Sequence, residues 1–232
     1  MKHNKTKINK NRGKNITKKK RKIKKETDLS NSALIVIDAQ NKYRYVMKKN
    51  EIKNMKKNVE VFKNAGCPVY FTQWSLCKNN NNCTRGHSKE SMIYKVIKRI
   101  NQDVYGLSCD TYEKKDIYKC PSKKCDIIDE LKEYSNNKNT FISNNLDSLQ
   151  INKLKNELIK NKIKKLYITG GWFSYCVLAT AYNCVNIHNI YPVVIQDAIF
   201  DDINYKKLLP PLIKSWMITA KTKDITNDNT PK

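Results

Sequence analysis

One cysteine of this chain stands where a protein thiol can act as a nucleophile. In "LYITGGWFSYCVLATAYN", residues 166–183, an apolar run leads into two glycines, and Cys176 follows in the first turn of a predicted helix. Unpaired backbone N–H groups and the helix dipole favour a thiolate there, so we expect the pKa of Cys176 to fall from about 8.5 toward neutrality. The same N–H groups suit a developing oxyanion.

A nucleophilic thiol also needs a proton acceptor, and Asp38 is the candidate. It follows an apolar run in "SALIVIDAQN", residues 32–41, which is typical of a strand buried on both faces of a parallel sheet. The carboxyl ends of parallel strands meet at one edge, so Asp38 and Cys176 can converge there. The alternative is structural: a buried cysteine, as we expect for Cys184, and an aspartate that caps a helix.

The segments that must position these residues alternate between strand and helix patterns. Helix patterns cover residues 51–65, which Gly66 ends, then 125–135, a stretch from Asn152 as N-cap, 175–188, and a last segment broken at Pro210 and Pro211. Strand-like runs cover residues 32–41, 67–74, 139–143, 164–170 and 190–198, and the last helical segment comes before residues 215–220. This alternation predicts an α/β fold with a parallel sheet and helices on both faces.

Charge and composition divide the chain further. The net charge is +25, of which residues 1–30 carry +11 from thirteen Lys and Arg against Glu26 and Asp28. We expect residues 1–30 to be a disordered basic tail and residues 31–232 to be one domain, with a variable insertion over 75–124. The tail is either an arm that binds RNA or a nuclear import receptor, or a solvated extension in a chain rich in Lys and Asn.

Other function classes are excluded or disfavoured. No apolar run approaches about 18 residues and no secretory h-region is present, so we expect no membrane contact, a location in the cytoplasm or nucleus, and free thiols. His87 and His188 are isolated, which is typical of structural or solvated histidines. Five cysteines lack the close Cys-x2-Cys pair of zinc sites, so we expect no metal; they are Cys77, Cys83, Cys109, Cys120 and Cys125.

Two segments resemble a known family. "ALIVIDAQN" is similar to the "ALLVIDMQND" opening of the isochorismatase-like cysteine hydrolases, which include isochorismatases, nicotinamidases and N-carbamoylsarcosine amidases. "LYITGGWFSYCVLATAYNC" and the later "YPVVIQDAIFDD" resemble that family's cysteine motif and the strand after it, and the similarity spans about residues 32–202. The resemblance implies a three-layer, Rossmann-like α/β/α sandwich around a mostly parallel sheet of about six strands, a homo-oligomer, a small-molecule substrate and no cofactor.

The resemblance also implies roles for individual residues. Cys176 would be the nucleophile and Asp38 the base, with a cis peptide bond between Gly171 and Trp172. The backbone N–H groups of Trp172 and Cys176 would form the oxyanion hole. Trp172 and Phe173 replace small or polar residues of the family, so they would either narrow the pocket or line it.

The chain departs from the family at two places. The position of the family's triad lysine holds Ser143, and no lysine occurs between Asn139 and Gln150. Lys42 is a lysine elsewhere in the chain that could substitute, but the sequence does not place it. The Asp-Trp-His zinc motif of nicotinamidases is also absent, because Ser75 follows Trp74.

Two functions remain open from the sequence. The first is a cofactor-free hydrolase of a small amide or related C–N bond, acting through Cys176 and Asp38. The second is a catalytically degenerate binding or scaffold protein on the same fold, directed to the nucleus or to RNA by residues 1–30. Ser143 favours the second function, and the retained Asp38 and Cys176 favour the first.

Overall fold

A single six-stranded sheet organises the computed structural model, which describes residues 29–74, 77–79, 82–85, 125–143, 145–186 and 188–226. Its strands are all parallel and lie in the order β5-β2-β1-β6-β7-β8. They are β1 (Ser32–Ile37), β2 (Val69–Trp74), β5 (Thr140–Ser143), β6 (Lys165–Gly170), β7 (Tyr191–Ile199) and β8 (Ile218–Ala220). The α/β fold predicted from the alternating patterns is confirmed. A separate antiparallel hairpin pairs β3 (Cys77–Asn79) with β4 (Asn82–Arg85).

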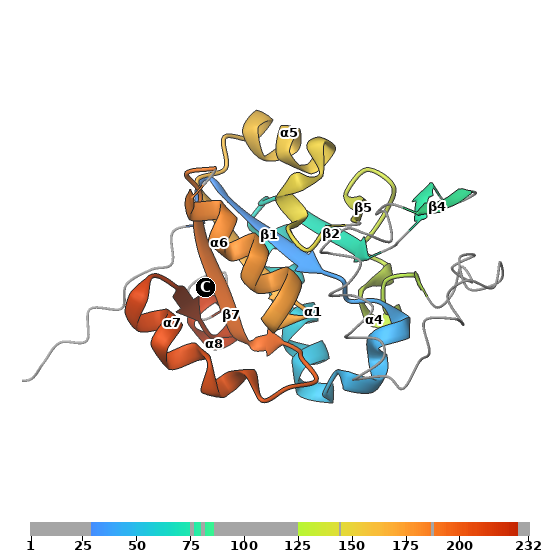
Figure 1. Ribbon diagram of the computed structural model, residues 1–232. Coiled ribbons are helices and arrows are strands. Elements are labelled where there is room, and N and C mark those ends of the chain that lie inside the picture. Colours follow the sequence, from blue (N-terminus) through green and yellow to red (C-terminus); the bar gives the residue numbers. More distant parts are fainter. Residues whose placement is uncertain are drawn as a thin grey trace, which may run out of the picture.

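Helices cover both faces of the sheet and make the expected three layers (Figure 1). One face packs against α5 (Asn152–Lys160), α6 (Leu178–Asn186) and α7 (Leu209–Ser215). The other packs against α1 (Lys49–Asn64), α4 (Asp129–Lys132) and α8 (Thr222–Thr226). Four short helical turns connect these elements: η1 (Asn41–Val46), η3 (Ser148–Gln150), η4 (Phe173–Val177) and η5 (Tyr205–Lys207).

The central strand β1 shows why this sequence forms a two-sided sheet. Every residue of β1 is buried. Ala33, Ile35 and Ile37 enter the core under α5 and α6, whereas Leu34 and Val36 enter the core under α1. Successive side chains of a strand point to opposite faces, so a continuous apolar run fills both cores at once.

Three local expectations from the sequence are wrong in detail. Pro210 and Pro211 do not break a helix; they lie in the first turn of α7, where a missing backbone N–H costs nothing. Asn152 is the first residue of α5 and Ile151 is its N-cap, without a side-chain hydrogen bond. Cys176 lies in a π-helical turn, η4, which precedes α6.

The proposed division of the chain stays a prediction. Residues 1–28 and most of 75–124 lie outside the described residues. The described part of the chain contains no helix whose length and hydrophobicity would let it span a membrane. Among the described residues, Cys176 and Cys184 are free thiols, whereas Cys125 is disulfide-bonded, so the expectation of free thiols is wrong for Cys125.

Gly170 ends β6 and Gly171 follows it, and contacts with neighbouring segments require a glycine at both positions. Gly170 has φ +100°, and a Cβ atom there would lie 2.1 Å from the carbonyl oxygen of Ile37. A Cβ atom on Gly171 would lie 2.3 Å from the ring of Phe200. No side chain fits between β6 and β1 at Gly170. The carboxyl ends of the two strands can therefore lie directly against each other.

We expect Gly170→Ala to lower the free energy of unfolding by at least about 3 kcal/mol, because it adds a backbone clash to an unfavourable φ. Gly66→Ala is the matched control: Gly66 also has positive φ, +70°, but open space around its missing Cβ. The left-handed conformation alone should cost the control about 1 kcal/mol. Urea denaturation of both variants measures the difference, and equal losses would contradict the steric argument.

Candidate active site

Three titratable side chains meet at the carboxyl edge of the sheet. Asp38 follows β1, Lys42 lies in η1 and Cys176 lies in η4. Ile37 pairs with Gly170 in the β1–β6 register, so the segments after both strands leave the sheet together. Asp38 has φ 49°, a left-handed conformation that turns the chain sharply out of β1.

The Asp38 carboxylate is buried but well supplied with hydrogen-bond donors. Thr72 on β2 donates its hydroxyl to Asp38 Oδ1 at 2.9 Å. Burial raises the pKa of Asp38 to about 6, although bonds from Thr72, the Cys176 thiol and the Trp74 N–H, and the charge of Lys42, each oppose this rise. Asp38 is therefore mostly ionised at neutral pH and accepts a hydrogen bond from the thiol.

The thiol of Cys176 is neutral in the resting protein. Its side chain is nearly inaccessible, with 5% exposed. Burial and the adjacent Asp38 carboxylate raise its pKa well above the ordinary value, and the backbone N–H groups of Trp172 and Cys176 offset only part of that rise. The pKa expected from the helix N-terminus is therefore wrong, because desolvation and a neighbouring negative charge outweigh the favourable N–H groups.

Lys42 supplies the positive charge of the site. Its ammonium donates to the carbonyl oxygen of Trp74 at 2.8 Å and lies 4.8 Å from the ring centroid of Tyr43. Burial lowers the pKa of Lys42 to about 8, while the Asp38 carboxylate, and Cys176 when it is a thiolate, act in the opposite direction. At neutral pH most of the protein therefore carries a cation that interacts with both other groups.

Ser143 lies beside the anchor of this lysine but takes no part in the charge cluster. Its buried hydroxyl donates to the carbonyl oxygen of Asn145 at 2.7 Å and accepts from the Asn145 N–H at 3.3 Å. Ser143 and Trp74 are partners in the β2–β5 register. The ammonium of Lys42 thus donates to Trp74, the register partner of Ser143, where the resemblance implies a lysine.

The turn before Cys176 contains the cis peptide bond, between Gly171 and Trp172. The carbonyl oxygen of Trp172 accepts from the N–H of Tyr175 at 3.2 Å and from the N–H of Val177 at 3.0 Å. These bonds close the turn around the sulfur, with the N–H groups of Trp172 and Cys176 within hydrogen-bonding reach of the thiol.

The two aromatic residues of this turn belong to opposite cores. The Trp172 ring packs edge-on against Tyr43 and Phe200, with centroids 5.4 and 5.9 Å apart. Phe173 is fully buried against Tyr205. Phe173 therefore helps to hold the turn, and Trp172 joins the turn to the η1 segment that carries Lys42.

Sequence reasoning missed Asp201, which supports the same turn. Its Oδ2 accepts from both the N–H and the hydroxyl of Ser174, each at 2.7 Å. Asp202 beside it has a pKa raised to about 6 by partial burial and by the hydrogen bond and charge of Asp201. The sequence did contain a signal for Asp201: the pair Asp201 and Asp202 follows the predicted strand over 190–198, and the strands of a parallel sheet end at the edge that holds Cys176.

No metal centre is visible in the part of the chain that the structure describes, where no three His, Cys, Asp or Glu residues cluster. Of the cysteines weighed as zinc ligands, Cys109 and Cys120 lie outside the described residues, as does His87. His188 follows α6 and precedes β7, at the opposite edge of the sheet from Asp38. It does not join the site.

Comparison with known proteins agrees with this geometry. The isochorismatase domain family matches residues 32–201. No curated protein matches the chain. A structure of N-carbamoylsarcosine amidase from Thermoplasma acidophilum has 16% sequence identity and a TM-score of 0.56, over 82% of this chain and 96% of that one.

Two further structures share the fold. A cysteine hydrolase from Pseudomonas syringae pv. phaseolicola has 11% identity and a TM-score of 0.62, over 88% of this chain and 96% of that one. The MAR1 ribonuclease from Caenorhabditis elegans has 16% identity and a TM-score of 0.57, over 84% of this chain and 80% of that one. At these identities the likeness shows the fold alone, but the family match covers most of the chain, and the chain therefore belongs to the isochorismatase family.

Proposed function

We propose that this protein is a cysteine hydrolase that splits a small amide or related C–N bond, with Cys176, Asp38 and Lys42 as its triad. Members of the isochorismatase family are generally hydrolases. The observation that carries the proposal is the hydrogen bond between the Cys176 thiol and the buried Asp38 carboxylate, with the Lys42 cation interacting with both. A proton acceptor, a nucleophile and a stabilising charge are thus together.

The proposed reaction begins with proton transfer from the Cys176 thiol to Asp38 as the sulfur attacks the carbonyl carbon. The oxygen of that carbonyl gains negative charge, which the N–H groups of Trp172 and Cys176 stabilise. Asp38 then returns its proton to the leaving nitrogen, the C–N bond breaks, and the acyl group stays on sulfur as a thioester. Water attacks the thioester with Asp38 as base, which releases the acid and restores the thiol.

The electrostatics of the site support this order of events. Because the pKa of Cys176 is raised, the thiolate forms only as the carbon–sulfur bond forms, when charge moves onward to the carbonyl oxygen. Lys42 offsets the negative charge that passes between carboxylate, sulfur and oxygen. Within a buried site such an interaction is worth several kcal/mol, since the local dielectric constant is low. This position of Lys42 weakens the argument for catalytic degeneracy that Ser143 raised.

We expect Cys176→Ala to abolish hydrolysis, with a loss of more than about 10⁴-fold in kcat. Lys42→Met should reduce kcat by about 10²- to 10³-fold, as for removal of one charge-stabilising group. Cys184→Ala is the matched control, because Cys184 is also a buried free thiol but lies in α6, outside the site. Ammonia release from a panel of small carboxamides and N-carbamoyl compounds, with mass spectrometry of the trapped thioester, measures both effects. Full activity of Cys176→Ala would refute the proposal.

The pH dependence of kcat/KM, which reports the pKa values of the free enzyme, should be bell-shaped, with limbs near pH 6 and pH 8. Asp38 must be ionised, so activity rises as pH passes its pKa of about 6. Lys42 must be protonated, so activity falls as pH passes its pKa of about 8. Lys42→Met should lose the alkaline limb near pH 8 and keep the acid one. An unchanged alkaline limb in that variant would assign it to another group.

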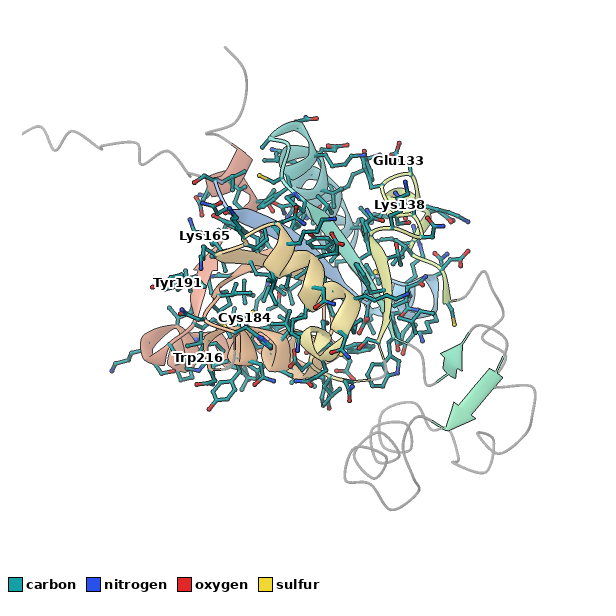
Figure 2. All side chains as sticks on the ribbon, turned by 90° about the horizontal axis from the view of Figure 1, so that it is seen from above. Glu133, Lys138, Lys165, Cys184, Tyr191 and Trp216 are labelled. Carbon is teal, nitrogen blue, oxygen red and sulfur yellow. The ribbon has the colours of Figure 1, made fainter. Side chains whose placement is uncertain are left out.

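RNA binding through the basic N-terminal residues is a second candidate function. Residues 1–30 carry a net charge of +11. The described chain begins at Leu29 beside a lysine-rich turn, where the carbonyl of Asn31 accepts from the N–H groups of Lys164 and Lys165 at 2.8 and 3.2 Å. Lys165 pairs in register with the exposed Tyr191, and Figure 2 shows both at one side of the molecule. That a MAR1 ribonuclease shares the fold suggests RNA as the polyanion to test.

We expect the full chain to bind a single-stranded RNA with an affinity that falls about 300-fold between about 50 and about 200 mM salt, if some six phosphates are contacted. Deletion of residues 1–28 should remove most of that affinity and flatten the salt dependence. Fluorescence anisotropy measures both, with Cys176→Ala as the control that leaves binding intact. Identical salt dependence with and without these residues would make them a passive extension.

A further inference from the structure

The lysine of the site is held through the backbone of another strand. The ammonium of Lys42 donates to the carbonyl oxygen of Trp74, the last residue of β2. A lysine side chain carries one compact charge at the end of a flexible four-carbon stem. The position of that charge therefore depends on the group to which the ammonium donates. The position of the Trp74 carbonyl therefore sets where the cation lies.

Gln40 fixes that carbonyl. Its Oε1 accepts from the Trp74 N–H at 2.9 Å, and its Nε2 donates to the Trp74 carbonyl oxygen at 3.4 Å and to the Cys125 carbonyl oxygen at 2.6 Å. The primary amide thus bonds both polar groups of one backbone residue, and the opposite orientation of the amide would place two donors face to face. Gln40 is fully buried, so water does not compete for these bonds.

The backbone around Gln40 is itself constrained. Gln40 forms an antiparallel bridge with Ile127, next to which the Ile128 N–H donates to the Ala39 carbonyl at 2.9 Å. The Asn41 N–H donates to the Asp126 carbonyl at 2.9 Å. Asp38 and Lys42 lie on either side of this bridge, so both side chains project from a rigid backbone segment.

We propose that Gln40 is a positioning residue: by bonding the peptide groups of Trp74, it sets the place of the Lys42 ammonium relative to Asp38 and Cys176. The inference rests on the proposed function, since it assigns Gln40 to the cation of that triad. Gln40 acts through Lys42 and needs no contact with the substrate. Without its amide, the Trp74 carbonyl and the ammonium that donates to it lose their fixed geometry.

Alkylation of Cys176 by iodoacetamide tests the proposal without a substrate. Among the described residues, Lys42 interacts electrostatically with the Asp38 carboxylate and with Cys176, which is charged only as the thiolate. A misplaced cation favours the thiolate less, so Gln40→Met should slow alkylation at pH 7 by about threefold to tenfold, where tenfold equals one unit in the thiol pKa. The effect should vanish above about pH 9.5, because burial lowers the pKa of Lys42 to about 8 and the wild-type site then has lost its cation.

Gln73→Met is the matched control. Gln73 donates to the same Cys125 carbonyl oxygen, at 3.1 Å, but its side chain does not bond Trp74. It should leave the alkylation rate unchanged, which separates loss of the Cys125 contact from loss of the Trp74 contacts. Gln40→Asn, which keeps a buried amide but is one methylene shorter, should give an intermediate rate and serves if Gln40→Met does not fold.

The double variant decides whether Gln40 acts through Lys42. In a Lys42→Met background, Gln40→Met should add no further slowing at pH 7. An equal slowing in both backgrounds, or slowing that persists above about pH 9.5, would overturn the positioning role. If Lys42→Met alone leaves the rate unchanged, the cation of the proposed triad fails, whereas slowing by Lys42→Met but not by Gln40→Met rejects only the inference about Gln40.

Discussion

The close approach of β1 and β6 at their carboxyl ends is the constraint on which the site depends. Gly170 lies against Ile37 with no room for a Cβ atom, and the Gly171 N–H donates to the Ile37 carbonyl oxygen at 2.9 Å. The chain therefore leaves both strands at the same height. Asp38 turns out of β1 in a left-handed conformation, and the turn after β6 brings the Cys176 thiol to its carboxylate.

Burial then determines the charge state of each group in this confined site. It is the largest cause of the perturbed pKa for Asp38, Lys42 and Cys176 alike, and in each case it opposes the charged form. The attraction between carboxylate and ammonium offsets part of that cost, so at neutral pH the two stay ionised beside a neutral thiol. A resting thiol of this kind is poorly reactive, because the thiolate is the nucleophile.

The position of Lys42 shows that what matters for a site is where a charge lies in space, and not which sequence position supplies it. Ser143 bonds its own turn, while Lys42 arrives from η1 and donates to Trp74, the register partner of Ser143. Lys42 thus brings a positive charge to the edge of the sheet where Ser143 has none. Comparison of aligned positions alone would record only the missing lysine.

The sequence by itself determined the sheet and the two strand ends. Continuous apolar runs such as β1 and β6 are local patterns. Successive side chains of a strand point to opposite faces, so an unbroken apolar run predicts burial on both faces. Asp38 could be named because it follows β1 directly, and Cys176 because it lies in the helical turn that follows β6. The resemblance to the family added the place of the cis peptide bond, and the glycine pair marked the sharp turn.

Only the tertiary structure decided the chemistry of the site. The ammonium of Lys42 reaches Trp74 across 32 positions of sequence, and the bonds of Gln40 to Trp74 and Cys125 span 34 and 85. The pKa of Cys176 was wrongly expected to fall, because a local helix argument omits the carboxylate and the burial that other strands impose. Periodicity can be read from neighbouring residues. The charge state and desolvation of a group depend instead on its distances to other groups, which are set only when the strands pair.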